Sequence, residues 1–353
     1  MRRSILYILA SFLLYSPSLY SRQPLRTDRP FSDTTKQSCQ QTATRLLEEA
    51  LTFMQKNYYR KESIDWKELA IAAKGRLPAS CNCEDAYNAI GWCFSQLNEA
   101  HSFLMPPGKA ATYNCDTAQL TQMPPLSKLV GEIKGEWLQD SIAYLTIPWV
   151  STTDSLICMQ IADSLQELIA RLDSRNVSKW IIDLRKNTGG NCWPMLAGIG
   201  PLLGNGVCGY FISANEKIPI TYRDGAALQG RHVLCRVSNN HYETRSLRKS
   251  IILLTGPRTI SAGEIVALAF RGKEEAYFYG QPTAGLTTAN ATYTLSDHSM
   301  LVLTVCQEAD RTGKICAGSI IPDKYIANNT LNTQNPQDAD PAKSEALRWL
   351  QTH

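Results

Sequence analysis

The chain has 353 residues, of which 36 are Lys or Arg and 32 are Asp or Glu, so its formal net charge is only +4. This length suits one large domain with a smaller one. Because the basic residues do not gather into a cluster, nothing in the sequence indicates binding to nucleic acid.

The N-terminus has the pattern of a secretory signal peptide. Arg2 and Arg3 precede an apolar run from Ile5 to Tyr15, and small and polar residues follow up to residue 21. The run is short for a membrane span, although a retained N-terminal anchor is the alternative. No later stretch reaches the length of a transmembrane helix. We therefore expect residues 1–21 to be removed and the protein to be periplasmic or secreted, without stable membrane insertion.

Residues 22–38 are polar and read as a leader, and residues 39–105 have a helical period. The start of the second helix has Asn82 followed by the acids Glu84 and Asp85, which suit an N-terminal cap. Two apolar stripes at spacings of three and four predict a helical subdomain. These stripes are Leu47, Leu51, Met54 and Tyr58, and Tyr87, Ile90, Phe94, Leu97 and His101.

Residues 106–141 predict an irregular linker or cap, which is too short for an additional domain. From residue 142 to 330, strand and helix patterns alternate, and this alternation predicts an α/β core. Residues 331–353 predict a tail and a closing helix that begins at Pro341. The expected strands are 142–147, 180–184, 251–254, 277–279 and 300–305, and the expected long helix is 155–172.

Eleven cysteines in an exported chain make disulfide bonds possible, and the odd number leaves at least one thiol unpaired. Cys81 and Cys83 lack a second pair at zinc-site spacing, so we expect no metal. Cys158 lies on an apolar helix face and reads as a buried free thiol. Proximity in the sequence favours two pairs, Cys192 with Cys208 and Cys306 with Cys316.

Ser261 lies in the stretch on which the functional interpretation depends. The apolar run 251–254 predicts a buried strand, Gly256-Pro257 ends it, and a helical pattern follows from Ile265. Ser261 is then at the first turn of a helix, where unpaired amides favour negative charge. A serine there can act as a nucleophile, with the Ala262 amide on an oxyanion, or Ser261 or Thr259 can simply cap the helix.

Two further stretches carry chemistry that would complement a nucleophile. Gly189-Gly190 follows the strand 180–184, and paired glycines can turn sharply and expose N–H groups to an oxyanion, although such a pair is often only a turn. Asp183 and Arg185 are expected to pair and brace this loop. His101 closes the second apolar stripe of the helical subdomain and is either a general base or a satisfied histidine.

These stretches together resemble serine peptidase family S41, the C-terminal-processing and tricorn-core-like peptidases. Four segments resemble that family's motifs in the family's order, and residues 97–102 resemble its upstream histidine segment. The resemblance implies a crotonase-like ββα spiral core, hydrolysis of peptide bonds in a polypeptide substrate, and no cofactor. The four segments are Asp183–Gly190, Ser261–Glu264, Gly280–Gly285 and Ser319–Asp323.

The resemblance also indicates a branch of the family. Leu286 stands where the Ser–Lys branch has its lysine base, and the region before the core is too short for a PDZ domain. His101 therefore becomes the expected base for Ser261, with amides from Gly189 or Gly190 and from Ala262 on the oxyanion.

The acid that would orient the histidine is not where the resemblance expects it, because Cys316 occupies that position. Three candidates remain: Asp310, Glu308 and Glu264, of which Glu264 could instead brace the nucleophile turn. The leading hypothesis is an exported serine endopeptidase. The alternative is a noncatalytic ligand- or peptide-binding protein on the same fold.

Overall fold

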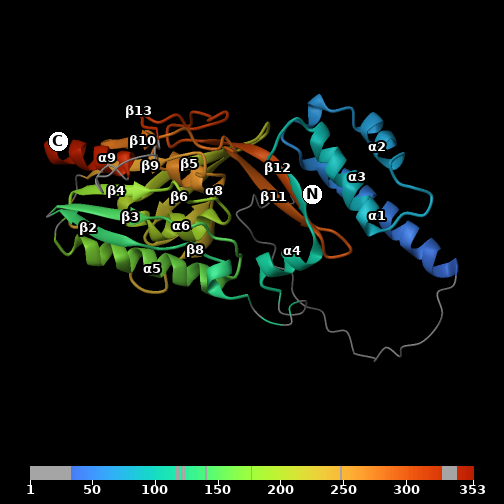
Figure 1. Ribbon diagram of the computed structural model, residues 1–353, viewed down its shortest axis with the longest axis horizontal. Coiled ribbons are helices and arrows are strands. Elements are labelled where there is room, and N and C mark those ends of the chain that lie inside the picture. Colours follow the sequence, from blue (N-terminus) through green and yellow to red (C-terminus); the bar gives the residue numbers. More distant parts are fainter. Residues whose placement is uncertain are drawn as a thin grey trace. The chain divides into compact units, whose positions relative to one another are not determined.

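A computed structural model describes residues 33–353 except 117–119, 121, 123, 140, 176, 247–248 and 328–339, and it divides into two compact units (Figure 1). Unit 1 comprises residues up to 110 together with 290–305, and unit 2 comprises 111–289 with 306–353. The stretch 290–305 therefore groups with the helical unit, although the sequence placed it in the core. The expected signal peptide lies outside the described residues.

Unit 1 contains the predicted helices, with the expected faces buried. Helix α1 begins at Asp33, within the expected leader, and its stripe from Leu47 to Tyr58 is buried. At the start of the next long helix, the Asn82 side chain accepts from the amides of Glu84 and Asp85, which confirms the predicted cap. The helices are α1 (Asp33–Asn57), η1 (Lys61–Ser63), α2 (Trp66–Lys74) and α3 (Cys83–Gln96).

The strands of unit 1 form a small antiparallel arrangement. In β1 (Phe103–Met105), Phe103 pairs with Val302 of β12 (Met300–Ala309), and β11 (Thr288–Thr294) also pairs with β12. The ring of Phe53 on α1 stacks on that of Tyr293, with the centroids 4.8 Å apart. The first part of β12 thus belongs to unit 1, and its last residues belong to unit 2.

The core of unit 2 is a six-stranded sheet in the order β13-β10-β9-β4-β3-β2. The strands from β13 to β3 pair in parallel, and β2 pairs antiparallel at the edge. The buried runs of β4 and β9 are apolar on both faces, as expected for parallel strands covered on both sides. The strands are β2 (Gly135–Gln139), β3 (Ile142–Thr146), β4 (Lys179–Asp183), β9 (Ser250–Thr255), β10 (Ala276–Gly280) and β13 (Lys324–Tyr325).

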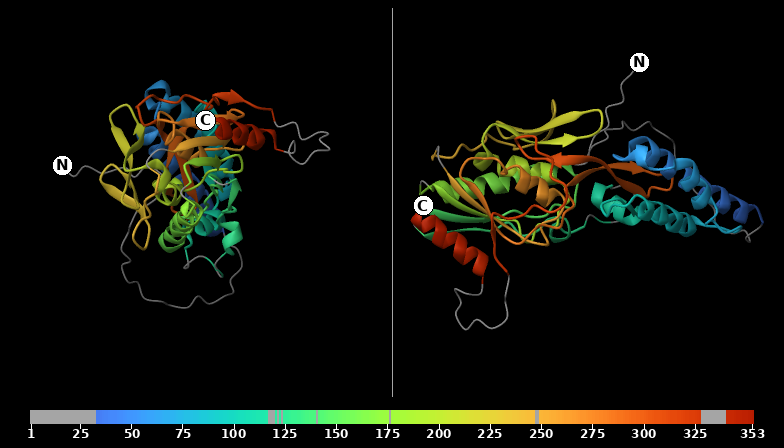
Figure 2. Two further views of the ribbon diagram at one scale, coloured as in Figure 1. Left: turned by 90° about the vertical axis from the view of Figure 1, so that its left-hand side faces the viewer. Right: turned by 90° about the horizontal axis from the view of Figure 1, so that it is seen from above.

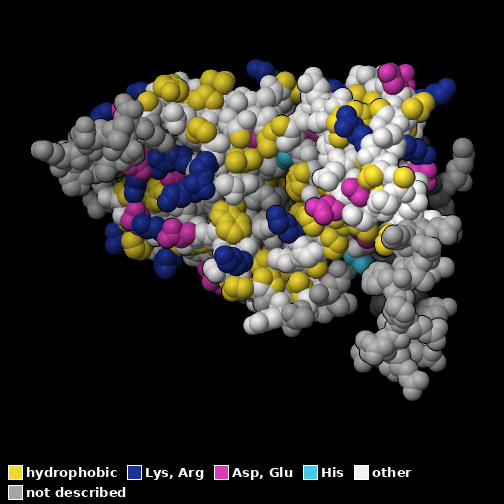
Figure 3. All heavy atoms as spheres, turned by 45° about the vertical axis from the view of Figure 1, so that its right-hand side comes forward, with side chains coloured by type: hydrophobic (Ala, Val, Ile, Leu, Met, Phe, Trp, Pro, Cys, Tyr) yellow, Lys and Arg dark blue, Asp and Glu magenta, His cyan; other side chains and the backbone are white. Residues whose placement is uncertain are grey.

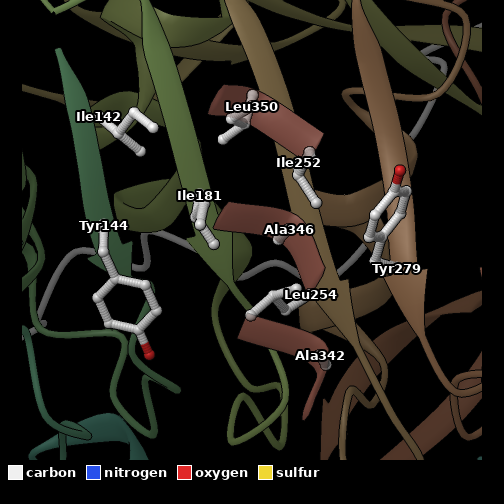
Figure 4. Close-up of a cluster of buried hydrophobic side chains, with 9 residues drawn as sticks. All are labelled: Ile142, Tyr144, Ile181, Ile252, Leu254, Tyr279, Ala342, Ala346 and Leu350. Atoms are coloured by element: carbon white, nitrogen blue, oxygen red, sulfur yellow. The ribbon is translucent and has the colours of Figure 1, made fainter. Parts of the chain in front are cut away.

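The closing helix α9 (Pro341–Thr352) has the predicted bounds and packs on the sheet. Its residues Ala342, Ala346 and Leu350, one turn apart, are fully buried against the side chains of β3, β4, β9 and β10 (Figure 4). Full burial of a leucine side chain contributes about 1.5–3 kcal/mol. The other helices of unit 2 are α5 (Ser155–Asp173), α6 (Cys192–Gly198), α7 (Gly200–Leu203) and α8 (Ala262–Leu268), and Figure 1 shows the sheet between α5 and α9.

A second, antiparallel sheet of unit 2 was not predicted. It joins the last residues of β12 to four consecutive strands, and Figure 2 shows these strands apart from the six-stranded sheet. Glycines at 206 and 209 and Pro219 interrupt the alternating pattern that would indicate strands. The four strands are β5 (Gly206–Ile212), β6 (Lys217–Arg223), β7 (Ala226–Gln229) and β8 (His232–Arg236).

The stretch expected to be irregular, residues 106–141, contains α4 (Pro107–Asn114), η2 (Leu126–Lys128) and β2. Because β2 pairs with β3, the sheet begins before residue 142. Within the described ranges, no helix is both long and apolar enough to cross a membrane. On the face drawn in Figure 3, Lys and Arg side chains lie among Asp and Glu, in keeping with the small net charge.

Candidate active site

Ser261 occupies a strained turn between a core strand and a helix. It follows β9 and stands directly before α8. Its backbone dihedrals are φ 52° and ψ −114°, a conformation that residues other than glycine rarely adopt. Such strain costs on the order of 1–3 kcal/mol and persists only where the surroundings enforce it. Ser261 is partly exposed. The predicted position at a helix start is confirmed.

Hydrogen bonds with the loop after β4 and with α8 itself enforce this turn. The Ile260 amide donates to the Asn187 carbonyl at 3.0 Å, and the Ser261 amide donates to Glu264 Oε2 at 2.9 Å. Thr259 is fully buried, and its hydroxyl donates to the Leu184 carbonyl at 2.9 Å and accepts from the Gly256 amide. Thr259 therefore ties β9 to the loop after β4, and it does not cap α8.

Glu264 is a buried carboxylate that braces the same turn. Besides the Ser261 amide, it accepts from the Thr283 hydroxyl and from the amides of Gly285 and Leu286, at 2.8 and 2.9 Å. Burial raises the pKa of Glu264, and these four hydrogen bonds oppose that rise because they favour the carboxylate. The contacts agree with the bracing role that the sequence left open, and they join the Ser261–Glu264 and Gly280–Gly285 segments.

Asn187 is the residue that positions the glycine pair. Its side chain is fully buried and donates to the carbonyls of Ile147 and Pro148, at 3.3 and 3.0 Å. Its carbonyl oxygen Oδ1 accepts from the Gly189 amide at 3.0 Å, a role that was not predicted from the sequence. Its position in the sequence, two residues before Gly189-Gly190, was the signal that could have indicated this role.

Gly189 and Gly190 approach other backbone segments too closely for a side chain. Both have positive φ, 93° and 101°. A Cβ on Gly189 would lie 2.7 Å from the Ile260 carbonyl and 3.1 Å from Ser261 Cβ, and a Cβ on Gly190 would lie 1.9 Å from the Val150 carbonyl. The glycine loop therefore packs directly against the Ser261 turn.

The amides near Ser261 differ in whether an acceptor already holds them. The Gly189 N–H donates to Asn187 Oδ1 at 3.0 Å, so the prediction that it could serve an oxyanion is not supported. By contrast, the N–H groups of Gly190 and Ala262 have no acceptor among the residues that the structure describes. These are the amides that could bind a developing negative charge.

A network of charged and polar side chains at the loop after β4 confirms the predicted pairing of Asp183 with Arg185. Arg185 donates to Asp183 and also to Asp340, with N–O distances of 2.6 Å to each, and the Tyr144 hydroxyl donates to Asp183 at 2.7 Å. Burial opposes the charge of Arg185, but its bonds to the two aspartates outweigh this and raise its pKa. The network ties the start of α9 to the loop after β4.

His101 belongs to unit 1, and it does not lie in the helix where the sequence placed it. Helix α3 ends at Gln96, and Asn98 has φ 53° and breaks the helical path. The Glu99 carboxylate then accepts from the amides of His101, at 2.7 Å, and Ser102, at 3.1 Å. His101 is therefore in a turn between α3 and β1.

Residues from the β11–β12 hairpin hold the backbone of this histidine turn. The Asn290 side chain donates to the His101 carbonyl at 3.1 Å, and the Thr304 hydroxyl, which has a single hydrogen to donate, lies 2.9 Å from Glu99 Oε2 and 3.1 Å from Asn290 Oδ1. Both Asn290 and Thr304 are buried. The turn is thus fixed by buried polar contacts within unit 1, a support that the sequence did not reveal.

The three candidate orienting acids all lie in unit 2 and have different surroundings. Glu264 holds the Ser261 turn, as described above. Asp310 Oδ1 accepts from the amides of Thr312 and Lys314, at 2.8 and 3.1 Å, and so closes the turn after β12. Glu308 is buried with neither carboxyl oxygen hydrogen-bonded to any described residue.

The expected disulfides are not formed, because all eleven cysteines carry free thiols. Cys192 is in α6 and Cys208 is in β5. Beyond β12, the Cys316 amide pairs with the Glu308 carbonyl, so Cys306 lies two residues away from the position opposite Cys316. Cys158 is buried and free, as predicted. The described residues contain no cluster of three or more potential ligands that could hold a metal.

Two relatives have sequence similarity to the chain. It is 31% identical over 223 residues to the nisin-resistance protein of Lactococcus lactis subsp. lactis, covering 63% of this chain and 62% of that protein. It is 28% identical over 147 residues to the chloroplastic carboxyl-terminal-processing peptidase 2 of Arabidopsis thaliana, covering 41% of this chain and 25% of that protein. The chain thus spans less than two thirds of the length of each relative.

Solved structures share the fold. A lipoprotein from Streptococcus agalactiae has a TM-score of 0.69 and 21% identity, covering 88% of this chain and 96% of that one. A photosystem II D1 C-terminal processing protease has a TM-score of 0.55 and 14% identity, covering 86% and 98%. The expectation of a mixed α/β fold with a helical N-terminal part is confirmed.

The family model described as peptidase family S41 matches residues 141–326, which include both the glycine loop and the Ser261 turn. This match covers more than half of the 353 residues. The chain therefore belongs to peptidase family S41.

Proposed function

We propose that the protein is an exported serine endopeptidase that hydrolyses polypeptides with Ser261 as nucleophile and His101 as general base. The observation that carries the proposal is the strained, partly exposed Ser261 turn, against which the glycine loop packs, together with the Gly190 and Ala262 amides, which have no acceptor among the described residues. Strain that several buried hydrogen bonds maintain is typical of a functional position.

In the proposed reaction, Ser261 Oγ attacks the carbonyl carbon of the scissile bond while His101 accepts the hydroxyl proton. The Gly190 and Ala262 amides donate to the oxyanion of the tetrahedral intermediate. As the C–N bond breaks, the imidazole returns the proton to the leaving amine. Water, deprotonated by the same imidazole, then hydrolyses the acyl-enzyme.

The proposed location rests on the N-terminal signal pattern, and the names of two similar proteins are in keeping with it. One relative is called a nisin-resistance protein and a similar structure is called a lipoprotein. We propose a periplasmic or secreted enzyme.

A fluorophosphonate probe followed by peptide mapping tests the nucleophile. We expect the label on Ser261, and we expect Ser261→Ala to lower turnover of an unfolded protein on the order of a thousandfold or more. A folded sample without label on Ser261 would count decisively against the mechanism.

The base is tested by His101→Ala, with His232→Ala as the matched control, because His232 is an exposed residue at the start of β8. Loss of a general base typically costs about a hundredfold to ten-thousandfold in rate. Equal activity of the two histidine variants would refute the assignment of His101.

The second candidate function is a noncatalytic peptide-binding protein on the same fold. Leu286 in place of the lysine base favours it, as does the engagement of Glu264 in bracing the turn. Peptide binding with no Ser261-dependent turnover would decide for this alternative.

A further inference from the structure

Unit 2 has a pocket of about 640 Å³ whose lining contains none of the candidate active-site residues. It lies between the first turns of α5 and the chain from η2 toward β2. This volume falls in the range of ligand-binding clefts, roughly 300–1,000 Å³. Its apolar lining consists of Leu126, Val130, Ile133, Trp149, Ile157 and Ile161.

The wall of this pocket connects to the glycine loop through backbone pairing. Residues 129–131 pair with 149–151, and residues 149–151 pair in turn with 189–191. Strand spacing is about 4.8 Å, so two spacings place the pocket wall on the order of 10 Å from the glycine loop beside Ser261. The pocket is therefore close enough to act on the same substrate, but it is separate from the reacting atoms.

The pocket opens beside an unpaired strand edge. The Lys134 N–H donates to the Thr146 hydroxyl and the Lys134 carbonyl accepts from the Thr146 amide, so both backbone polar groups of Lys134 face β3. The neighbouring Ile133 N–H and carbonyl have no hydrogen-bond partner among the described residues, and β2, which follows, is the edge strand. An extended peptide can add to such an edge by main-chain hydrogen bonds and place alternate side chains in an adjacent pocket.

The lining determines which side chain fits. Glu132, which is exposed, is the one ionisable residue among the pocket's lining residues, and most of the others are apolar. Burial of an apolar side chain here would be favourable, whereas an acidic side chain would lose hydration and meet a like charge.

We propose that this pocket is a remote substrate subsite, which binds an apolar side chain of the polypeptide while the chain pairs with the edge at Ile133. The subsite rests on the proposed peptidase function for its purpose, but binding can be measured without hydrolysis. It selects substrates by a residue that does not flank the scissile bond.

The test uses the full chain with Ser261→Ala and a fluorescein-labelled extended peptide that has one central Leu among Ser and Thr residues. Ile157→Asp places a charge in the pocket, and Leu156→Asp makes the same change one residue earlier, at an exposed side chain outside the lining. Fluorescence anisotropy should show a Kd at least tenfold weaker for Ile157→Asp, and an unchanged Kd for Leu156→Asp. Replacing the peptide Leu by Asp should weaken binding to a similar degree.

Ser164→Trp provides a second route, because it fills the pocket from an exposed position of α5 without removing a packed side chain. It should weaken peptide binding as Ile157→Asp does. On a background with Ser261 intact, both variants should keep the wild-type rate of labelling by a small fluorophosphonate while KM for the Leu peptide rises.

The outcomes separate the two proposals. Unchanged Kd in both pocket variants overturns the subsite, whatever the enzyme does. Weaker binding in the pocket variants without any Ser261-dependent turnover supports the subsite and overturns the peptidase.

Discussion

Two buried glutamates, Glu264 in helix α8 and Glu308 on strand β12, have different surroundings. Glu264, in the first turn of α8, accepts four hydrogen bonds from the residues around Ser261. Glu308, on β12, is buried among apolar residues that include Ile265 and Leu268 of α8, and neither of its carboxyl oxygens has a hydrogen-bond partner among the described residues.

The difference shows where this fold can hold a charge. Burial raises the pKa of both groups, but only Glu264 has donors that favour its carboxylate. The pKa of Glu308 is raised well above its ordinary value, first by burial and then by the nearby charge of Glu264. The side of α8 beside Ser261 is therefore built to fix a polar turn, whereas the side facing β12 offers no described hydrogen-bond partner to the Glu308 carboxyl.

The largest effect is expected from removing the acceptor on the Ser261 side. Glu264→Ala removes the acceptor of four donors, the Thr283 hydroxyl and three backbone amides, and each hydrogen bond to a charged group contributes about 1.5–3 kcal/mol. Urea unfolding should show this loss, and fluorophosphonate labelling of Ser261 should slow because the turn relaxes. Glu264→Gln, which keeps one acceptor oxygen, should fall between the wild type and the alanine variant. Wild-type stability and labelling in Glu264→Ala would show that the four bonds do not hold the turn.

Removal of a single donor to Glu264 should lower the free energy of unfolding by less than removal of Glu264 itself. Thr283→Val removes the hydroxyl that donates to Glu264 and accepts from the Ile320 amide at 2.8 Å. Loss of a hydrogen bond to a charged group costs about 1.5–3 kcal/mol. Thr283→Ser keeps the hydroxyl and serves as the control in the same unfolding experiment. Equal stability of the valine and serine variants would mean that the hydroxyl contributes nothing measurable.

Much of the core could be predicted because its signals are local. The apolar runs of β4 and β9 and the helical spacing of α5 and α9 fixed those elements to within one or two residues. The Gly256-Pro257 break and the pattern after it placed Ser261 at a helix start. The antiparallel strands β5 to β8 were not predicted, because their alternation of apolar and polar residues is interrupted and their burial depends on strands far apart in the sequence.

Other features depended on geometry that spacing does not encode. His101 continued a helical stripe in the sequence, but the left-handed Asn98 and the Glu99 carboxylate end the helix before it. The cysteine pairs were close in sequence, but strand register keeps Cys316 opposite Glu308. The engagement of the Gly189 amide by Asn187 could likewise be recognised only from the folded loop.

A substitution of Glu308, which packs against the other side of α8, should raise the stability of the fold rather than lower it. Glu308→Leu replaces an unpartnered buried carboxyl by an apolar side chain of similar size, and relief of an unsatisfied group is worth about 1–3 kcal/mol, so stability should rise.

The gain from Glu308→Leu should also depend on pH. The folded pKa of Glu308 lies above its unfolded value, so the unfolded chain loses its proton first as the pH rises. Wild-type stability then falls with increasing pH above the ordinary range of a glutamate, about 4.3, by up to about tenfold in the unfolding constant per pH unit. Urea unfolding across this range should show the advantage of Glu308→Leu widening as the pH rises. Glu308→Gln should remove the pH dependence but gain little at low pH, since its amide remains unpartnered. A leucine variant less stable than the wild type at every pH would show that the carboxyl is satisfied and that the two sides of α8 are alike.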